Sequence, residues 1–330
     1  MVAVVVAYNR RELLLECLAA LDSQSRPLDA IVVVDNASTD GTGDALRSLS
    51  EHRSLSEAQP RRSGETKGPS LDILTLTENT GGAGGFAAGI RRALEAHEPD
   101  LVWLMDDDTI PTPTALQQLV QVKLAEPRLV LLGSRAVWTD GRDHPMNTPK
   151  RRLGVSRSTI LHAAAHAAIP VRSSSFVSML VDADAIRRHG LPIADYFIWN
   201  DDFEYSTRLL KRGEGWYVPG SVVVHKTKAL GSSDADPGER FYFEVRNKLW
   251  LFRFARNFRW WEAPLYWAAT ARRWSRTRRH TTDAAVLKAA GSRGWRDGWR
   301  ARPRPTDEVL AAAGYPVAER GPRDEASGLP

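Results

Sequence analysis

The sequence contains a single cysteine, Cys17, among its 330 residues. No disulfide can form within such a chain, and we expect a reducing compartment, the cytoplasm. No apolar run reaches the roughly 18 residues that a membrane-spanning helix needs, which argues against an integral membrane protein. No secretory signal is visible, because the chain opens directly on a predicted strand, Val2–Ala7.

Two common nucleotide-binding motifs are also missing. A G-x-G-x-x-G fingerprint follows the first strand of NAD enzymes, but Tyr8, Asn9 and Arg10 stand at that place here. The chain has no P-loop either. A sugar-1-phosphate nucleotidyltransferase would need a glycine-rich, basic loop after its first strand to hold a triphosphate, so that class is a remote alternative.

The first half of the chain alternates predicted strands and helices. Apolar residues make up 42% of the chain and charged residues 26%, which is typical of a globular protein with a large core. The alternation predicts an α/β fold with a mostly parallel, doubly wound sheet. The polar segment 51–70 is predicted to be a surface insertion. The predicted strands are 2–7, 30–34, 71–77 and 101–105, and the predicted helices are 11–24, 42–49, 85–96 and 113–125.

Three consecutive carboxylates, Asp106, Asp107 and Asp108, follow the apolar strand Leu101–Met105. Ligands of open α/β sheets bind at the carboxyl ends of the strands. Three ionised Asp side chains repel one another, which favours a bound cation there. A solvated acidic loop after a core strand would have the same sequence, so the triplet alone leaves both interpretations open.

Two more polar segments follow predicted strands. Asp35 can accept hydrogen bonds from a base or ribose, or it can cap the next helix. The glycines of Gly81–Gly85 allow backbone N–H groups to approach a phosphate ahead of the helix 85–96, although glycine-rich turns also occur without a ligand.

The middle of the chain offers acidic residues for acid–base chemistry. Asp201, Asp202 and Glu204 open a predicted helix, 202–212, where carboxylates are ordinary partners of the helix dipole and are also suited to general base catalysis. Trp199 can stack on a sugar or pack in the core. Three histidines show no useful metal-ligand spacing and are predicted to be surface or structural residues: His144, His162 and His166. Strands are predicted at 129–133, 136–138 and 173–184, and a strand pair is predicted at 216–218 and 221–224.

The last third is basic and rich in tryptophan. Between Arg246 and Arg304 there are sixteen Lys or Arg residues, three acidic residues and seven Trp residues. Arginine mixed with aromatic residues in helices suits an anionic membrane surface. Nucleic acid, a helical cap on the rest of the protein and an oligomer contact are the alternatives, of which nucleic acid is disfavoured. The segment 315–330 is predicted to be a disordered tail.

Several of these segments together resemble the family 2 glycosyltransferases, which have the GT-A fold. The double-glycine loop and the triple Asp are most similar to actinobacterial galactofuranosyltransferases, which use UDP-galactofuranose to extend a lipid-linked cell-wall glycan. The resemblance covers about residues 2–255. It rests on VVVAYNR (4–10), VVVDNASTDGT (32–42), ENTGGAGGFAAG (78–89), WLMDDDTIP (103–111), FIWNDDFEYSTRL (197–209), VVVHK (222–226) and RFYFEVRNKLWL (240–251).

The resemblance implies an inverting, metal-dependent transfer with Asp202 as the general base. A catalytic domain would span 1–245, with a nucleotide-binding half, 1–110, and an acceptor-binding half, 111–245. Residues 246–314 would form a membrane-associating or capping helical region. Mn²⁺ or Mg²⁺ would be held by Asp106, Asp108 and His225. The acceptor would be bound by Asp201 and Glu204, which position its hydroxyls, and by Trp199, which stacks on a sugar face. The implied nucleotide-sugar contacts are Tyr8, Asn9, Asp35, Asn79, Gly81, Gly82, Asp106 and Asp107.

Three questions stay open at this point. A rhamnosyltransferase using dTDP-rhamnose would share most of these motifs, and a non-catalytic nucleotide-sugar-binding module is a further alternative. The implied lipid acceptor predicts a peripheral position on the inner face of the cell membrane, reached through residues 246–304. A homo-oligomer is also compatible with the sequence.

Overall fold

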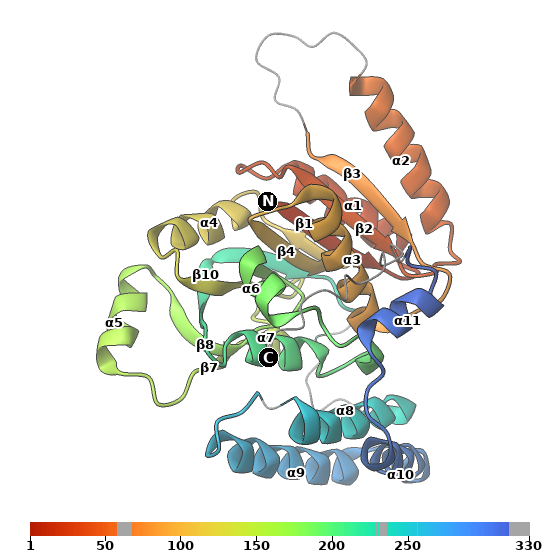
Figure 1. The fold of residues 1–330 in the computed structure, drawn as a ribbon, viewed down its shortest axis with the longest axis vertical. Coiled ribbons are helices and arrows are strands. Elements are labelled where there is room, and N and C mark those ends of the chain that lie inside the picture. Colours follow the sequence, from red (N-terminus) through yellow and green to blue (C-terminus); the bar gives the residue numbers. More distant parts are fainter. Residues whose placement is uncertain (58–67, 229, 231–235, 256, 317–330) are drawn as a thin grey trace, which may run out of the picture.

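The structure, a computed structural model, describes residues 1–57, 68–228, 230, 236–255 and 257–316. Within these residues ten strands join into one sheet in the order β3-β2-β1-β4-β9-β6-β10-β8-β7, with β5 paired to β10 (Figure 1). The strands are β1 Val2–Ala7, β2 Ala30–Asp35, β3 Ser70–Thr75, β4 Leu101–Asp106, β5 Thr109–Pro111, β6 Leu129–Val137, β7 Lys150–Arg151, β8 Ile169–Ser173, β9 Met179–Asp182 and β10 Glu214–His225. The α-helices are α1 Arg11–Asp22, α2 Thr42–Glu57, α3 Gly81–His97, α4 Ala115–Ala125, α5 Arg157–Ala165, α6 Ala183–His189, α7 Asp201–Leu209, α8 Phe241–Phe254, α9 Glu262–His280, α10 Ala284–Arg300 and α11 Thr306–Ala312.

The predicted parallel, doubly wound sheet is confirmed for the first four strands of this order. β3, β2, β1 and β4 are parallel neighbours, and every residue of β1 is buried. Val4 packs on one face with Phe86 of α3, while Val5 packs on the other face with Leu18 of α1. The alternating side chains of one apolar strand thus fill two cores.

The second half of the sheet is mixed, so the prediction of a mostly parallel sheet is wrong there. β9 lies antiparallel between β4 and β6, and β10 is parallel to β6 but antiparallel to β5 and β8. A strand buried on both faces has the same continuous apolar pattern in either direction, so the sequence of Met179–Asp182 could not reveal its orientation.

Several predicted boundaries are also corrected. α2 continues to Glu57, so the predicted insertion begins later, and its residues 58–67 lie outside the described part. β6 and β10 are each a single strand where two strands were predicted. β10 continues past Pro219 and Gly220, where its register with β6 shifts. The predicted strand 173–184 is divided between the end of β8 and β9.

The glycine run is helix, not loop, because α3 begins at Gly81. A Cβ atom at Gly85 would lie 2.4 Å from Cγ1 of Val6, and one at Gly81, where φ is +67°, would lie 2.1 Å from the carbonyl oxygen of Phe197. Glycine is therefore required here for close packing against β1 and the segment before α7.

The C-terminal helices form a layer of their own beside the sheet domain (Figure 1). α8 and α10 bury a small core with α9, in which Phe241, Leu249 and Trp274 take part. α11 returns to α3, where the hydroxyl of Tyr315 donates to Glu95 at 2.9 Å. Tyr315 is buried, so the predicted tail begins too early, and residues 317–330 lie outside the described part. No helix in the described ranges has the length and apolarity to cross a membrane.

Candidate active site

Two strand ends bring the acidic triplet and His225 together. Asp106 closes β4, and the chain turns through Asp107 and Asp108 into β5, which pairs antiparallel with the end of β10. This pairing sets His225 opposite Thr109 and its Nε2 3.1 Å from Oδ1 of Asp108. One ligand atom from each of Asp106, Asp108 and His225 lies within 4.8 Å of the others. Residues distant in sequence therefore form the predicted metal-ligand group.

The hydrogen bonding of this group fits a cation. The Nδ1 atom of His225 lies 2.9 Å from Oδ1 of Asn147, whose amide NH₂ donates to Ser175, so Nδ1 carries the proton. Nε2 of the ring then faces Oδ1 of Asp108, a buried oxygen without a well-aligned hydrogen bond. A ring nitrogen directed at a buried carboxylate oxygen, with a second residue orienting the ring, is the usual arrangement around a metal ion.

The three carboxyl groups of the triplet differ in their pKa values. Burial and the neighbouring Asp108 raise the pKa of Asp106 to about 7, and burial raises the pKa of Asp107 to about 6. Burial alone would also raise the pKa of Asp108, but the hydrogen bond and charge of His225 and the charge of Arg10 hold that pKa below its ordinary value. Asp108 is thus the most firmly ionised carboxylate of the three.

Arg10 is a site residue that the sequence analysis did not single out. Its guanidinium donates to Asp107 at 3.2 Å and also to Asp108. The available signal was a cationic residue directly after β1, since β1 is the parallel neighbour of β4 and their carboxyl ends lie at one edge.

The predicted nucleotide-binding residues lie at this same edge, at the ends of β1 and β2 and the start of α3. Tyr8 is 43% exposed, and its backbone N–H donates to Asp107 at 3.0 Å. Asp35 is buried and accepts from the N–H of Ser38 at 2.9 Å, while Asn9 accepts from the N–H of Thr39 at 2.7 Å. Asn79 accepts from the N–H of Gly81 at 2.8 Å. The carboxyl and amide oxygens thus also hold the loops in place.

Asn36 is a second residue that sequence reasoning missed. Its amide donates to the carbonyl of Gly81 at 2.9 Å and accepts from the N–H of Thr80 at 2.9 Å, and Asn36 is almost fully buried. It ties the end of β2 to the first turn of α3. Its position one residue after Asp35 was the available signal.

The segment before α7 has a constrained backbone. Phe197, Trp199 and Asn200 have φ values of +64°, +65° and +64°, which non-glycine residues seldom adopt. The buried amide of Asn247 on α8 holds this segment by donating to the carbonyls of residues 196, 198 and 199 at 2.8–2.9 Å. Such a strained turn persists when surrounding contacts fix it, and it is typical of functional sites.

Asp201 and Asp202 stand in the first turn of α7, directly after this turn. Burial raises the pKa of both carboxyls, and for Asp201 the charges of Asp202 and Asp106 raise it further. The carboxylate of Asp201 lies near the start of α3, because a Cβ atom at Gly82 would be 3.8 Å from its Oδ2 atom, and it is close enough to the acidic strand end to feel the charge of Asp106. The carboxylate of Asp202 accepts a hydrogen bond from the backbone N–H of Phe203 at 2.6 Å and interacts with the side chain of Ser175. The charge of the buried Lys248 also acts on it.

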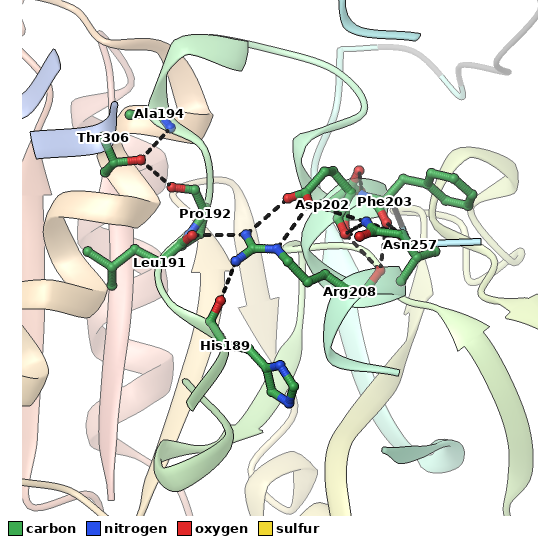
Figure 2. Close-up of polar contacts among 12 residues, drawn as sticks. His189, Leu191, Pro192, Ala194, Asp202, Phe203, Arg208, Asn257 and Thr306 are labelled. Atoms are coloured by element: carbon green, nitrogen blue, oxygen red, sulfur yellow. Dashed lines mark hydrogen bonds and ion pairs between the residues drawn. The ribbon is translucent and has the colours of Figure 1, made fainter. Parts of the chain in front are cut away.

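Glu204 has a geometry that differs from the predicted acceptor contact. It is 1% exposed, and its two oxygens accept from the guanidinium of Arg208 at 2.9 and 3.0 Å. Arg208 also donates to the carbonyls of His189 and Leu191, as Figure 2 shows, and Asn257 donates to the Glu204 carbonyl. We therefore assign Glu204 to the support of α7. Trp199, in the turn before α7, is half-buried, and its carbonyl accepts from Asn247.

Residues 2–185, more than half of the chain, match the model of Glycosyl transferase family 2. The chain belongs to glycosyl transferase family 2. It is therefore a glycosyltransferase, as the sequence motifs predicted.

Two mycobacterial relatives of this family 2 glycosyltransferase are named galactofuranosyltransferase GlfT1. The protein of Mycobacterium tuberculosis is 31% identical over 263 residues, which cover 74% of this chain and 80% of the relative. The protein of Mycolicibacterium smegmatis is 31% identical over 228 residues, which cover 64% of this chain and 65% of the relative, less than two thirds of its length.

Solved structures confirm the GT-A fold. GalNAc-T7 with UDP, GalNAc and Mn²⁺ superposes with a TM-score of 0.60 at 13% identity, covering 95% of this chain and 57% of that one. The mannosyltransferase PcManGT of Pyrobaculum calidifontis, with GDP-Man and Mn²⁺, gives 0.53 at 20% identity, covering 95% and 85%. Staphylococcus aureus TarS 1–349 with UDP-GlcNAc gives 0.59 at 16% identity, covering 94% and 83%.

Proposed function

We propose that this glycosyltransferase is metal-dependent and inverting, and that it transfers galactofuranose from UDP-galactofuranose to a hydroxyl group of a lipid-linked glycan. The observation that carries the proposal is the group of Asp106, Asp108 and His225 at the edge of the sheet. The buried carboxylates of Asp201 and Asp202 support it, because Asp201 lies near Gly82 at the start of α3 and within the electrostatic influence of Asp106. The donor sugar is taken from the galactofuranosyltransferases to which the chain is 31% identical.

The donor side holds the departing nucleotide. Asp106, Asp108 and His225 would hold a divalent cation, Mn²⁺ or Mg²⁺, and such a cation would supply positive charge to stabilise the leaving diphosphate. Mn²⁺ is present in two of the structural neighbours, GalNAc-T7 and PcManGT. Tyr8, Asn9 and Asp35 would line the nucleoside pocket. Arg10 donates to Asp107 and Asp108, and its charge favours the ionised form of both.

The acceptor side supplies the proton acceptor. Asp202 would take the proton of an acceptor hydroxyl. At the same time the oxygen of that hydroxyl would form a bond to the anomeric carbon, and the bond between this carbon and the UDP oxygen would break. Attack opposite to the leaving group inverts the anomeric centre. Burial raises the pKa of Asp202, which makes its carboxylate a stronger base than an exposed one. Asp201 and Trp199 would position the acceptor.

Only part of the basic, Trp-rich region is exposed and could contact a membrane. Trp250 and Trp274 are buried, as are Arg246 and Lys248, so these four residues belong to the helical core and the site and not to a surface. Trp260 is 88% exposed, and Trp267, Trp295 and Trp299 are also exposed, in α9, α10 and the segment before them. We propose that these residues and their neighbouring arginines lie on the inner face of the cell membrane, near the lipid acceptor.

Ligand binding and transfer test this function separately. Thermal unfolding would be followed with UDP or dTDP, each with and without Mn²⁺, and we expect stabilisation by UDP that increases with Mn²⁺. Transfer would then be assayed with UDP-galactofuranose and a rhamnosyl lipid acceptor. Stabilisation by dTDP instead of UDP would favour rhamnosyl transfer, and stabilisation without any transfer would favour a non-catalytic binding module.

Replacing Lys248 by methionine should change the pH dependence of transfer. The charge of Lys248 lowers the pKa of Asp202, and burial lowers the pKa of Lys248 itself to about 8. Without that charge the pKa of Asp202 rises, so the acid limb of kcat/KM moves to higher pH. The two profiles should converge at higher pH, where Asp202 is ionised in both proteins. The exposed Lys288→Met serves as the control, and a loss that is equal at every pH would contradict this role.

A further inference from the structure

A second cluster of metal-ligating side chains lies away from the active site, between the end of α4 and the end of α5. Glu126 follows α4 as its C-cap residue, and His162 and His166 lie four residues apart in α5 and at its C-cap. Side chains four residues apart share one face of a helix. The predicted absence of useful metal spacing for these histidines is therefore wrong, because the third ligand comes from another helix.

The three side chains converge on one point. Oε1 of Glu126 lies 2.6 Å from Nε2 of His162 and 3.4 Å from Nε2 of His166. One ligand atom from each residue lies within 4.8 Å of the others. A single ion could therefore contact both imidazoles and the carboxylate after small side-chain rotations.

The surroundings hold these side chains in place and leave one side open. Both imidazole rings pack against the buried Trp216, with ring centroids 5.7 Å away in each case. The second oxygen of Glu126 forms an ion pair with Nε of Arg128 at 3.2 Å, which orients the carboxylate as outer-shell partners of metal sites do. An open depression lined by Ser158 and Thr159 leads to the cluster from solvent.

We propose that Glu126, His162 and His166 form a second cation site that binds Zn²⁺. Two imidazoles and one carboxylate are a common ligand set for Zn²⁺, and the open side leaves room for a water as fourth ligand. Mg²⁺ prefers oxygen ligands, so it is expected to avoid this cluster. Because Glu126 and His162 are 36 residues apart in sequence, an ion bound by both would stabilise the folded protein.

Zinc titration of the full chain tests the proposal independently of transfer. The His225→Ala variant removes a ligand of the active-site group, so zinc bound by the chelator-treated variant reports on the second site. We expect calorimetry to give one bound equivalent and thermal unfolding to show stabilisation by Zn²⁺. Both signals should disappear when His162→Ala and His166→Ala are added, and both should remain when the exposed His280→Ala is added instead.

Two further measurements guard against misfolding and mistaken sites. Circular dichroism without metal should show the same fold for all three proteins, and Glu126→Gln, which keeps the side-chain shape, should weaken zinc binding without unfolding the chain. Co²⁺ bound to the His225→Ala variant should give the visible absorption of a four-coordinate site. This absorption should be absent when His162→Ala and His166→Ala are added to that variant. Equal zinc binding with and without His162 and His166, or no bound equivalent in the His225→Ala variant, would overturn the proposal.

Discussion

Replacing Asp202 by asparagine should lower kcat by about 10²- to 10⁴-fold, the usual contribution of a general base. Asparagine has nearly the same size and can still accept the hydrogen bond from the N–H of Phe203, so the first turn of α7 should persist. It cannot take a proton from the acceptor hydroxyl. The KM values for donor and acceptor should change little, because the substitution removes a contribution specific to the transition state.

The neighbouring carboxylates supply the controls for this experiment. Asp184→Asn, at an exposed position in the first turn of α6, should leave kcat unchanged. Asp201→Asn should raise the acceptor KM more than it lowers kcat, because Asp201 is proposed to position the acceptor. Full turnover of the Asp202→Asn variant, together with an inactive Asp201→Asn variant, would transfer the role of base to Asp201.

Replacing Asp108 by alanine should lower kcat/KM by about a hundredfold to a thousandfold. A metal ion contributes several kcal/mol to the stabilisation of developing charge, and each 1.36 kcal/mol corresponds to a factor of ten. Asp108 is expected to dominate because His225 and Arg10 keep it ionised, whereas the pKa of Asp106 is raised to about 7. Mn²⁺ binding, measured by calorimetry in the presence of UDP, should weaken in parallel.

Metal removal provides the matched measurement for this variant. A chelator should lower the rate of the unmodified protein to a similar level, and Mn²⁺ should restore it. The same chelator should have little further effect on Asp108→Ala, because that variant has already lost a ligand. The exposed Asp184→Ala should respond as the unmodified protein does. An Asp108→Ala variant that keeps full activity in chelator would rule out the proposed metal role.

The acidic triplet and its surroundings show how far local patterns reach. The apolar run before Asp106 predicts a buried strand, and the parallel order of the first strands predicts a common edge for their carboxyl ends. His225 and Asp202 were named for this site through the resemblance to known enzymes. Spacing alone could not pair His225 with Asp108, because that contact depends on the antiparallel pairing of β5 with β10.

Long-range contacts explain the residues that were misjudged. Lys248 and Arg246 were counted in a basic surface region, but α8 packs against the segment before α7 and buries both. Glu204 looked like its acidic neighbours, yet the turn of the helix directs it to Arg208. His162 and His166 had the spacing of one helix face, but their third partner, Glu126, directly follows α4.

The sequence by itself determined the α/β class, the first four strands, the acidic strand end and the family, because these depend on local apolar patterns and on motifs read within one segment. The tertiary structure alone decided the mixed direction of the later strands, since a buried strand has the same composition in either direction. It also decided which charged residues face the site, which support it and which form the second cluster. Those roles follow from burial and from partners on other elements, and neither is encoded in the spacing of nearby residues.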